Sequence, residues 1–315
     1  MLSTPPAHRT RPEVPASYPG PVPPAVPSRL SAAEWTALAR AHAERADALT
    51  AGHRARRATG TRHPVEDFLY EYYSARPALL RRWHPGAGVA LEPGADGPAP
   101  HAAWRWYATA DDGAVALDLD AFRADRGDTV AFVARLLAAT ASRPAHTGCF
   151  GLHEWAMVYR ADEHRHPVPL RLGRAGTDAV VESSSPVRCS HFDAFRFFTP
   201  AAVGRNRLQP TRATQVDLEQ PGCLHATMDL YKWAYKLGPA VPGELLLDCF
   251  ALAADVRELD MRASPYDLRA AGYEPVAIET PEGRAQYAAA QRGFARRGAG
   301  LRSRLLEVCA RLRHG

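Results

Sequence analysis

The chain has very little lysine and no long apolar run. Its 315 residues carry 39 basic side chains, yet only Lys232 and Lys236 are lysines, so arginine supplies nearly all of the positive charge. No stretch reaches the roughly 18 apolar residues of a transmembrane helix, so the sequence predicts no membrane span. The N-terminus has no charged segment followed by an apolar one, which argues against a secretory signal and favours a cytoplasmic location.

Cysteine is scarce as well, and several well-known motifs are missing. The five cysteines are an odd number and contain no C-x-x-C, which predicts reduced thiols with no disulfide partner. The same pattern argues against a structural zinc ribbon and against a four-cysteine iron–sulfur cluster. No G-x-S-x-G, G-x-x-x-x-G-K or G-x-G-x-x-G is present, which argues against α/β-hydrolase, P-loop and dinucleotide-binding proteins.

Proline and charge divide the chain into three predicted parts. Nine prolines fall within residues 1–30, and the segment has little apolar character. We therefore predict that it is a disordered tail that is dispensable for folding. Residues 31–62 predict an N-terminal helix, opened by a capping box of Ser31 and Glu34, and a basic linker. Residues 63–315 predict a mainly helical catalytic domain.

Apolar periodicity within the predicted domain favours helices over strands. The predicted helices cover 63–73, 128–142 with Asp128 as N-cap, 220–237, 244–259 and 280–312. Two short runs, 104–109 and 114–118, flank an Asp-Gly turn and predict a β-hairpin, and a further strand is predicted at 178–182 in an otherwise loop-like segment. The fold class is therefore mainly α, a single helical domain with a small β-hairpin element.

The segment 220–237 is predicted to be the central helix. At helical spacing His225, Asp229, Lys232 and Lys236 form one polar stripe between two apolar ones. One interpretation is a solvated face on which Asp229 pairs with Lys232. The other is the wall of an active site.

Three histidine–carboxylate pairs interrupt otherwise apolar and aromatic segments. They are His153 with Glu154, His191 with Asp193, and His225 with Asp229. Buried charged groups are usually paired or functional, so we expect the three histidines to converge on one polar cleft. Two histidines and one carboxylate are the ligand set of mononuclear non-haem iron sites, and these six residues are a pool from which such a site can be built.

A second group of residues is basic and aromatic. Its arginines lie in the loop 204–212, and the aromatic side chains lie in the neighbouring predicted helices. The arginines are Arg205, Arg207 and Arg212, and the aromatics are Trp155, Tyr159 and Trp233. Arginines that contact phosphates and aromatic faces that stack on an unpaired base are what base-flipping enzymes need, and the formal net charge of +5 permits a DNA partner.

Several long segments resemble a family of high-GC bacterial proteins that usually carries the name 3-methyladenine DNA glycosylase. They are HPVEDFLYEYYSARPALLRRWHPG (63–86), GLHEWAMVYR (151–160), RCSHFDAFRFFTP (188–200), NRLQPTR (206–212) and QPGCLHATMDLYKWAYKLGP (220–239). The resemblance implies DNA repair by cleavage of the N-glycosidic bond of alkylated purines, with no cofactor.

Under that implied function a carboxylate is needed near the developing positive charge of the sugar. We predict Asp229 for this role, with Asp193 as second candidate and His225 as the group that orients Asp229. Lys232 is a candidate Schiff-base nucleophile. The alternative is a metal-dependent enzyme of the non-haem iron type, using iron or another divalent metal, and a non-catalytic binding protein also stays open.

Overall fold

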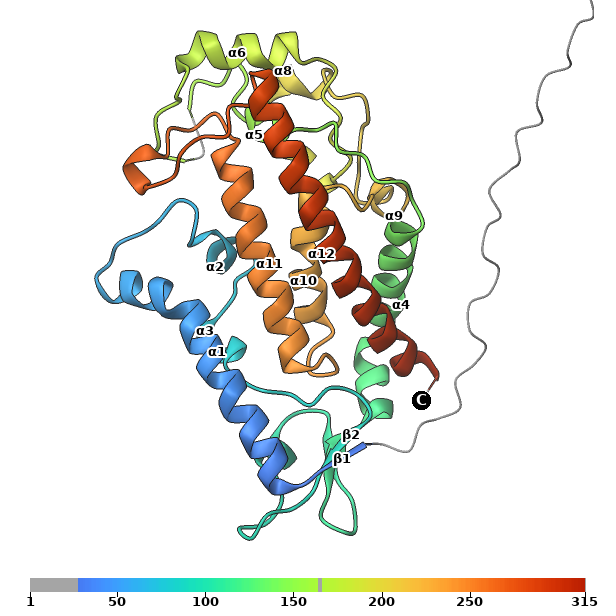
Figure 1. The fold of residues 1–315 in the computed structure, drawn as a ribbon. Coiled ribbons are helices and arrows are strands. Elements are labelled where there is room, and N and C mark those ends of the chain that lie inside the picture. The colour runs from blue at the N-terminus through green and yellow to red at the C-terminus, as the bar shows by residue number, and fades with distance from the viewer. Residues whose placement is uncertain (1–27, 164–165, 315) are drawn as a thin grey trace, which may run out of the picture.

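A computed structural model describes residues 28–163 and 166–314 of the chain (Figure 1). Residues 1–27 of the predicted tail lie outside these described residues. The fold is mainly α-helical, as predicted. The helices are α1 (Ala32–Ala58), α2 (Phe68–Tyr72), α3 (Pro77–Leu80), α4 (Leu119–Ala141), α5 (Leu152–Ala156), α6 (Gly173–Ser183), α7 (Phe192–Phe195), α8 (Pro200–Val203), α9 (Gln215–Leu218), α10 (Leu224–Lys236), α11 (Gly243–Arg262) and α12 (Pro281–His314).

A small sheet lies at one end of the helices. Its strands are β1 (Ser28–Leu30), β2 (Val89–Leu91), β3 (Tyr107–Thr109) and β4 (Val115–Leu117), in the order β1-β2-β4-β3. The predicted hairpin is confirmed as the antiparallel pair β3–β4, in which Ala108 faces Ala116. Strand β1 pairs in parallel with β2, so the prediction that residues 28–30 belong to a disordered tail is wrong, since these residues form part of the sheet.

Helix α10 lies at the centre of the helical layer. It packs against α11 and α12, and α12 also packs against α4 (Figure 1). Ten of its 13 residues are buried, because apolar side chains surround the helix on most sides. Among the described residues, no helix combines the length and the apolar character that crossing a membrane requires.

Several predicted elements differ from the structure, and the helix predicted at 63–73 is limited to α2. Helix α4 begins at Leu119 and not at Asp128, because the Asp118 carboxylate accepts a hydrogen bond from the backbone N–H of Ala121 at 2.9 Å and caps the helix. The strand predicted at 178–182 is wrong, since this segment lies within α6. Thr177, Val180 and Val181 are buried at helical spacing, so packing overrides the β propensity of the valines.

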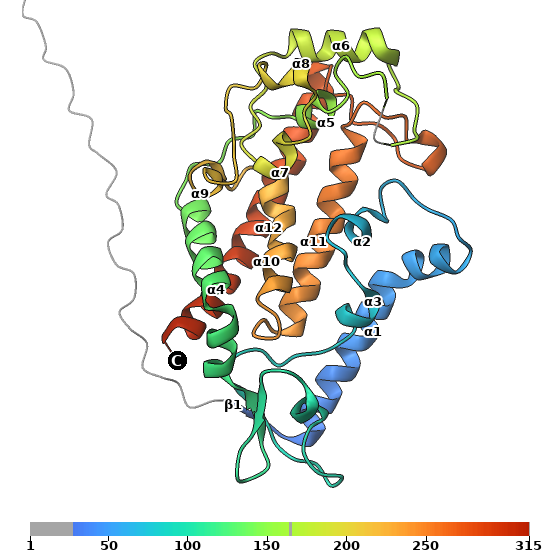
Figure 2. The ribbon, with the colours of Figure 1, turned by 180° about the vertical axis from the view of Figure 1, so that it is seen from behind.

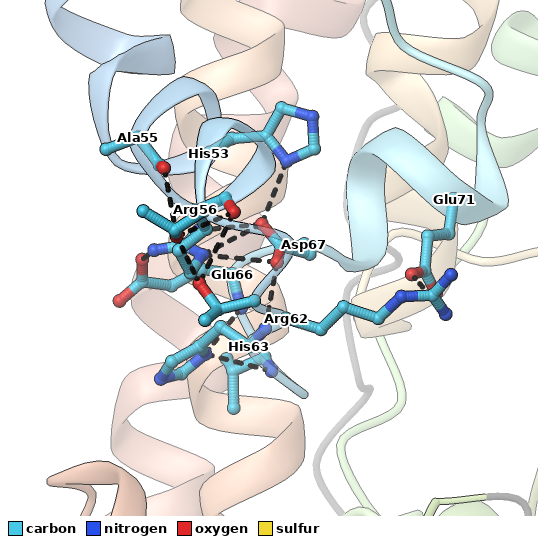
Figure 3. A network of polar contacts seen from close by, with 11 residues as sticks. His53, Ala55, Arg56, Arg62, His63, Glu66, Asp67 and Glu71 are labelled. Atoms are coloured by element: carbon cyan, nitrogen blue, oxygen red, sulfur yellow. Dashed lines mark hydrogen bonds and ion pairs between the residues drawn. The ribbon is translucent and has the colours of Figure 1, made fainter.

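The basic run lies at the end of α1, which continues to Ala58, and its His53 and Arg56 join a partly buried polar network (Figure 3). Arg56 donates hydrogen bonds to Asp67 at 2.7 and 3.1 Å, and its Nη1 donates to Glu66 at 2.6 Å. The Nδ1 atom of His53 lies 2.9 Å from Asp67 Oδ1. The side chain of Asp67 is only 7% exposed, so this network ties α1 to the segment before α2.

Replacing Asp67 with asparagine should lower the free energy of unfolding by about 1–3 kcal/mol, because Arg56 would lose its charged partner in a buried place. Urea denaturation would measure the change. The matched control is Glu71→Gln, because the ion pair of Glu71 with Arg62 is 60% and 84% exposed. We expect the control to change stability by less than about 0.5 kcal/mol.

The effect of Asp67→Asn should depend on pH. Burial alone would raise the pKa of Asp67, but the hydrogen bonds from Arg56 and His53 outweigh burial and lower the pKa to about 2. The carboxylate therefore stabilises the fold fully above the pKa of an unfolded aspartate, about 4, and loses this contribution as pH falls through about 2. The stability difference between variant and wild type should be large at pH 7 and shrink toward pH 2. A difference that does not change with pH would contradict this account.

Candidate functional site

The polar stripe of α10 points into the protein over its first turns. His225 and Asp229 are buried, Lys232 is largely covered, and Lys236 is exposed. The interpretation as a solvated face is therefore wrong for the first part of the stripe. Short helices, among them α5 and α7, cover this end of α10 (Figure 2). Their residues meet the stripe in two neighbouring groups.

The first group consists of His153 on α5, His225 on α10 and Asp260 on α11. Each offers one ligand atom, and these atoms lie within 4.8 Å of one another. The Nε2 atom of His153 is 2.8 Å from Asp260 Oδ1. The rings of His153 and His225 are 4.5 Å apart between centroids. All three side chains are buried. Two imidazoles and one carboxylate form the ligand set of a facial-triad metal site.

A buried arginine supports this first group. The Nη1 atom of Arg257 donates to Asp260 Oδ2 at 3.2 Å and to Glu154 Oε1 at 2.9 Å. Its guanidinium carbon lies 3.8 Å from the ring centroid of Phe68. Arg257 therefore fixes one oxygen of Asp260 and leaves the other hydrogen-bonded to His153 at 2.8 Å, a bond that a metal ion between these two side chains would replace. Glu154, predicted as a possible ligand, is the ion-pair partner of this arginine.

The second group consists of His191, Glu219 and Asp229, again with ligand atoms within 4.8 Å of one another. The Nε2 atom of His191 is 3.3 Å from Glu219 Oε1 and 3.4 Å from Asp229 Oδ2. His191 immediately precedes α7 and Glu219 immediately follows α9. The amide of Gln215 donates to Glu219 Oε1 at 2.6 Å. This group offers one imidazole and two carboxylates.

Asp229 has three polar neighbours. The hydroxyl of Tyr73 donates to its Oδ1 at 2.5 Å, and Lys232 Nζ donates to its Oδ2 at 3.0 Å. Lys232 also donates to Asp193 at 2.7 Å. The predicted pairing of Asp229 with Lys232 is thus present, and the same lysine also binds Asp193. The predicted role of His225 as partner of Asp229 is wrong, because His191 takes that place from another element.

His225 joins the two groups. Its ring lies 4.5 Å from that of His153 and 5.3 Å from that of His191. The prediction that the three histidines converge on one site is therefore confirmed. Their rings come from α5, from α10 and from the residue before α7, so the site exists only once these three segments have packed together.

The electrostatics of the two groups follow from their burial. Burial would raise the pKa of Asp229, but Lys232, His191 and Tyr73 outweigh it and hold this pKa well below its usual range. Burial lowers the pKa of His225 well below the ordinary value, and the neighbouring His153 lowers it further. His225 is therefore neutral at physiological pH and keeps a lone pair for a ligand or a metal.

Small cavities lie on two sides of His225. One is lined by His225, by His153 and by the thiols of Cys149, Cys189 and Cys223. The other, of about 20 Å³, is lined by apolar and aromatic side chains together with Glu154, Asp193 and Arg257. Its apolar and aromatic lining comes from Phe68, Tyr72, Met157 and Phe197. The first group of ligands therefore borders water-sized spaces.

The predicted stacking residues lie in the hydrophobic core. Trp155, Tyr159 and Trp233 are all buried. The indole N–H of Trp155 donates to the backbone oxygen of Ala263 at 2.8 Å, and the hydroxyl of Tyr159 donates to Glu182 at 2.8 Å. A flipped base would reach these rings only if the core opened.

The predicted phosphate contacts are divided between surface and interior. Arg207 and Arg212 are exposed. Arg205 is half-buried, and its Nη2 atom lies 3.8 Å from Glu182 Oε1. Its guanidinium carbon lies 4.8 Å from the ring centroid of Tyr159. The arginine loop thus presents two of its three cations to solvent. DNA binding by this loop stays a prediction.

Sequence reasoning missed four residues of the site, namely Tyr73, Glu219, Arg257 and Asp260. Asp260 carried a usable signal, because Arg257 and Asp260 are charged residues three positions apart at the end of a helix that is otherwise apolar on that face. Glu219 carried none beyond its place before Pro221. Pairings such as that of His153 with Asp260, 107 positions apart, leave no local pattern.

Comparisons with protein-family models, with curated proteins and with solved structures find no match to this chain. Its function is therefore inferred from the two ligand groups. The N-glycosylase hypothesis stays a prediction, because no comparison bears on it.

Proposed function

We propose that the chain is a metal-dependent enzyme of the non-haem iron type, in which His153, His225 and Asp260 hold a divalent metal. One observation carries the proposal. Two imidazoles and one carboxylate are buried together, with ligand atoms within 4.8 Å of one another. Iron(II) is the metal that a two-histidine, one-carboxylate set favours, although zinc and manganese accept similar ligands.

The state of His225 supports this assignment. Its ring packs against the imidazoles of His153 and His191 and borders both small cavities. A neutral imidazole that faces open space beside a second imidazole and a carboxylate has a lone pair available for a metal. Asp260 is pre-oriented by Arg257, as outer hydrogen bonds commonly orient metal-binding carboxylates.

The surroundings of the group suggest what could reach the metal. Iron(II) in a facial triad would supply open coordination positions at which dioxygen is activated. The cavity beside His225 has apolar and aromatic walls that include Phe68, Met157 and Phe197, and its volume of about 20 Å³ has room for about one water-sized molecule. These walls would also keep bulk water away from the reacting groups.

The proposal predicts that His225→Gln loses the metal while the fold is kept. Glutamine retains much of the size of histidine and removes the imidazole ligand. Full-length wild type and variant would be reconstituted with iron(II) under anaerobic conditions, desalted and analysed for iron per chain. We expect tight binding in the wild type and a loss of at least about 100-fold in affinity in the variant.

His84→Gln is the matched control, because His84 is a half-buried histidine near the sheet whose Nδ1 lies 3.0 Å from the hydroxyl of Tyr107. The control should bind iron as the wild type does, and melting curves should show that both variants are folded. Wild-type protein that binds no iron, manganese or zinc would contradict the proposal. The buried charges would then form a purely structural network.

A further inference from the structure

The imidazole of His191 is buried among carboxylates but is not properly hydrogen-bonded to them. Only 1% of this residue is exposed. Neither ring nitrogen forms an aligned hydrogen bond, although Nε2 lies 3.3 Å from Glu219 and 3.4 Å from Asp229. Three polar side chains from separate segments thus point at a common centre, but no aligned hydrogen bond joins His191 to either carboxylate. A buried donor or acceptor left in this way calls for a missing partner.

The spacing of these atoms suits a metal ion better than a hydrogen bond. A nitrogen–oxygen hydrogen bond has its optimum near 2.9–3.0 Å, about 0.4 Å shorter than the two distances here. Metal–ligand bonds of about 2.0–2.2 Å place two ligands of a tetrahedron roughly 3.4 Å apart. Both contacts of His191 match that edge. The three ligand atoms also lie within 4.8 Å of one another, so none is out of reach of one ion.

The groups around the three side chains are arranged as outer support for such an ion. Tyr73 donates to Asp229 Oδ1 and thereby directs Oδ2 toward His191. Gln215 fixes Glu219 Oε1 by a hydrogen bond of 2.6 Å. Lys232 Nζ donates to Asp229 Oδ2 at 3.0 Å, so this oxygen would share its lone pairs between the ammonium group and a bound cation. Glu219 Oε1 likewise keeps a lone pair beside the hydrogen bond from Gln215. Hydrogen bonds of this kind position the ligands of many protein metal sites.

We propose that His191, Glu219 and Asp229 bind a second divalent cation, next to the metal held by His153, His225 and Asp260. The two ions would then form a two-metal centre with His225 between the ligand groups, since its ring lies 5.3 Å from His191 and 4.5 Å from His153. The second site stands on its own geometry, whereas the two-metal centre rests on the proposed function of the first group. Two adjacent ions can clamp one substrate or share one oxygen-derived ligand.

The stoichiometry of manganese(II) binding tests the second site. Full-length protein would be stripped with a chelator, titrated with manganese(II) and followed by calorimetry and by electron paramagnetic resonance. The wild type should bind two ions per chain, and their proximity should broaden or couple the resonance signal. Asp229→Asn and His191→Gln should each bind one ion, with the signal of an isolated manganese.

Asp260→Asn should also bind one ion, now at the second group, and the double variant with Asp229→Asn should bind none. Asp217→Asn is the control, because Asp217 is an exposed carboxylate on α9 close to Glu219 in sequence, and it should bind two. If the wild type binds only one ion, and this ion is kept by Asp229→Asn and lost by Asp260→Asn, the second site is overturned and the first is not. No bound ion in the wild type would overturn both sites.

Tyr73→Phe tests the support group separately, since it keeps the ring and removes the hydrogen bond to Asp229. Tyr73 is a positioning residue in this proposal. Its variant should keep two ions per chain at saturation but bind the second about 10–100-fold more weakly. A variant with unchanged affinity for both ions would show that Asp229 needs no such support and would count against the assigned geometry.

Discussion

Asp260→Asn is expected to abolish metal binding at the first group and to destabilise the protein. The substitution keeps the shape of the side chain and removes the charge that faces His153 and Arg257. Loss of a ligand should weaken metal binding by more than the 10–100-fold typical of outer hydrogen-bonding partners. Leaving Arg257 without this carboxylate in a buried place should cost about 3–5 kcal/mol of unfolding free energy.

These two effects are separable by experiment. Unfolding of chelator-treated protein measures only the stability that is lost with the ion pairs of Asp260. The additional stabilisation on adding iron(II) measures how well each variant binds the metal. Asp255→Asn is the matched control, because Asp255 lies on the same helix and pairs with Arg297, with both side chains 51% exposed. The control should bind iron normally and change stability by less than about 1 kcal/mol. Equal behaviour of the two variants would contradict the assignment of Asp260.

Arg257→Met is the second substitution with a large expected effect. It keeps an apolar stem beside Phe68 but leaves Glu154 and Asp260 buried near each other without their shared cation. Burial raises the pKa of Glu154, and loss of Arg257, whose charge lowers this pKa, would raise it further. We expect a loss of about 3–5 kcal/mol, measured by urea denaturation of metal-free protein.

The control for Arg257→Met is Arg297→Met on α12, which removes only the exposed pair with Asp255 and should cost less than about 1 kcal/mol. Added iron(II) should partly restore Arg257→Met, because a cation next to Asp260 would replace part of the lost positive charge. A variant as stable as the wild type would mean that the carboxylates near Arg257 are neutral in the folded protein.

Local sequence signals predict α10 and α11, two of the helices that carry the site. The Pro-Gly pairs around 220–237 and the apolar stripes between them predicted α10, which spans Leu224–Lys236. The capping box of Ser31 and Glu34 is present as predicted. The β-hairpin is present as well, since the Asp-Gly turn fixes β3 and β4 locally.

Features that depend on distant residues could not be predicted in this way. Strand β1 pairs with β2 about 60 positions later, and no local pattern encodes a parallel pair of three residues. The same limit applies inside the site. The sequence placed His225 and Asp229 one turn apart on a helix, but only packing decides that Asp229 meets His191 and Tyr73 while His225 meets His153.

The aromatic residues show a related limit. The sequence predicts that Trp155 and Trp233 stack on a base. Tryptophan is found both in protein cores and on binding surfaces, so the residue type alone does not separate the two. Their burial depends on what α10, α11 and α12 place over them, which composition does not reveal. The histidine–carboxylate pairs were a better guide to the site, because buried charges must find partners and therefore gather.

Crystals of the full chain soaked in iron(II) and measured at the iron absorption edge would test the central claim most directly. The account predicts an anomalous peak about 2.0–2.2 Å from a ring nitrogen of His153, a ring nitrogen of His225 and Oδ1 of Asp260. An ordered site with no peak between these residues, and with His153 Nε2 still 2.8 Å from Asp260 Oδ1, would contradict it.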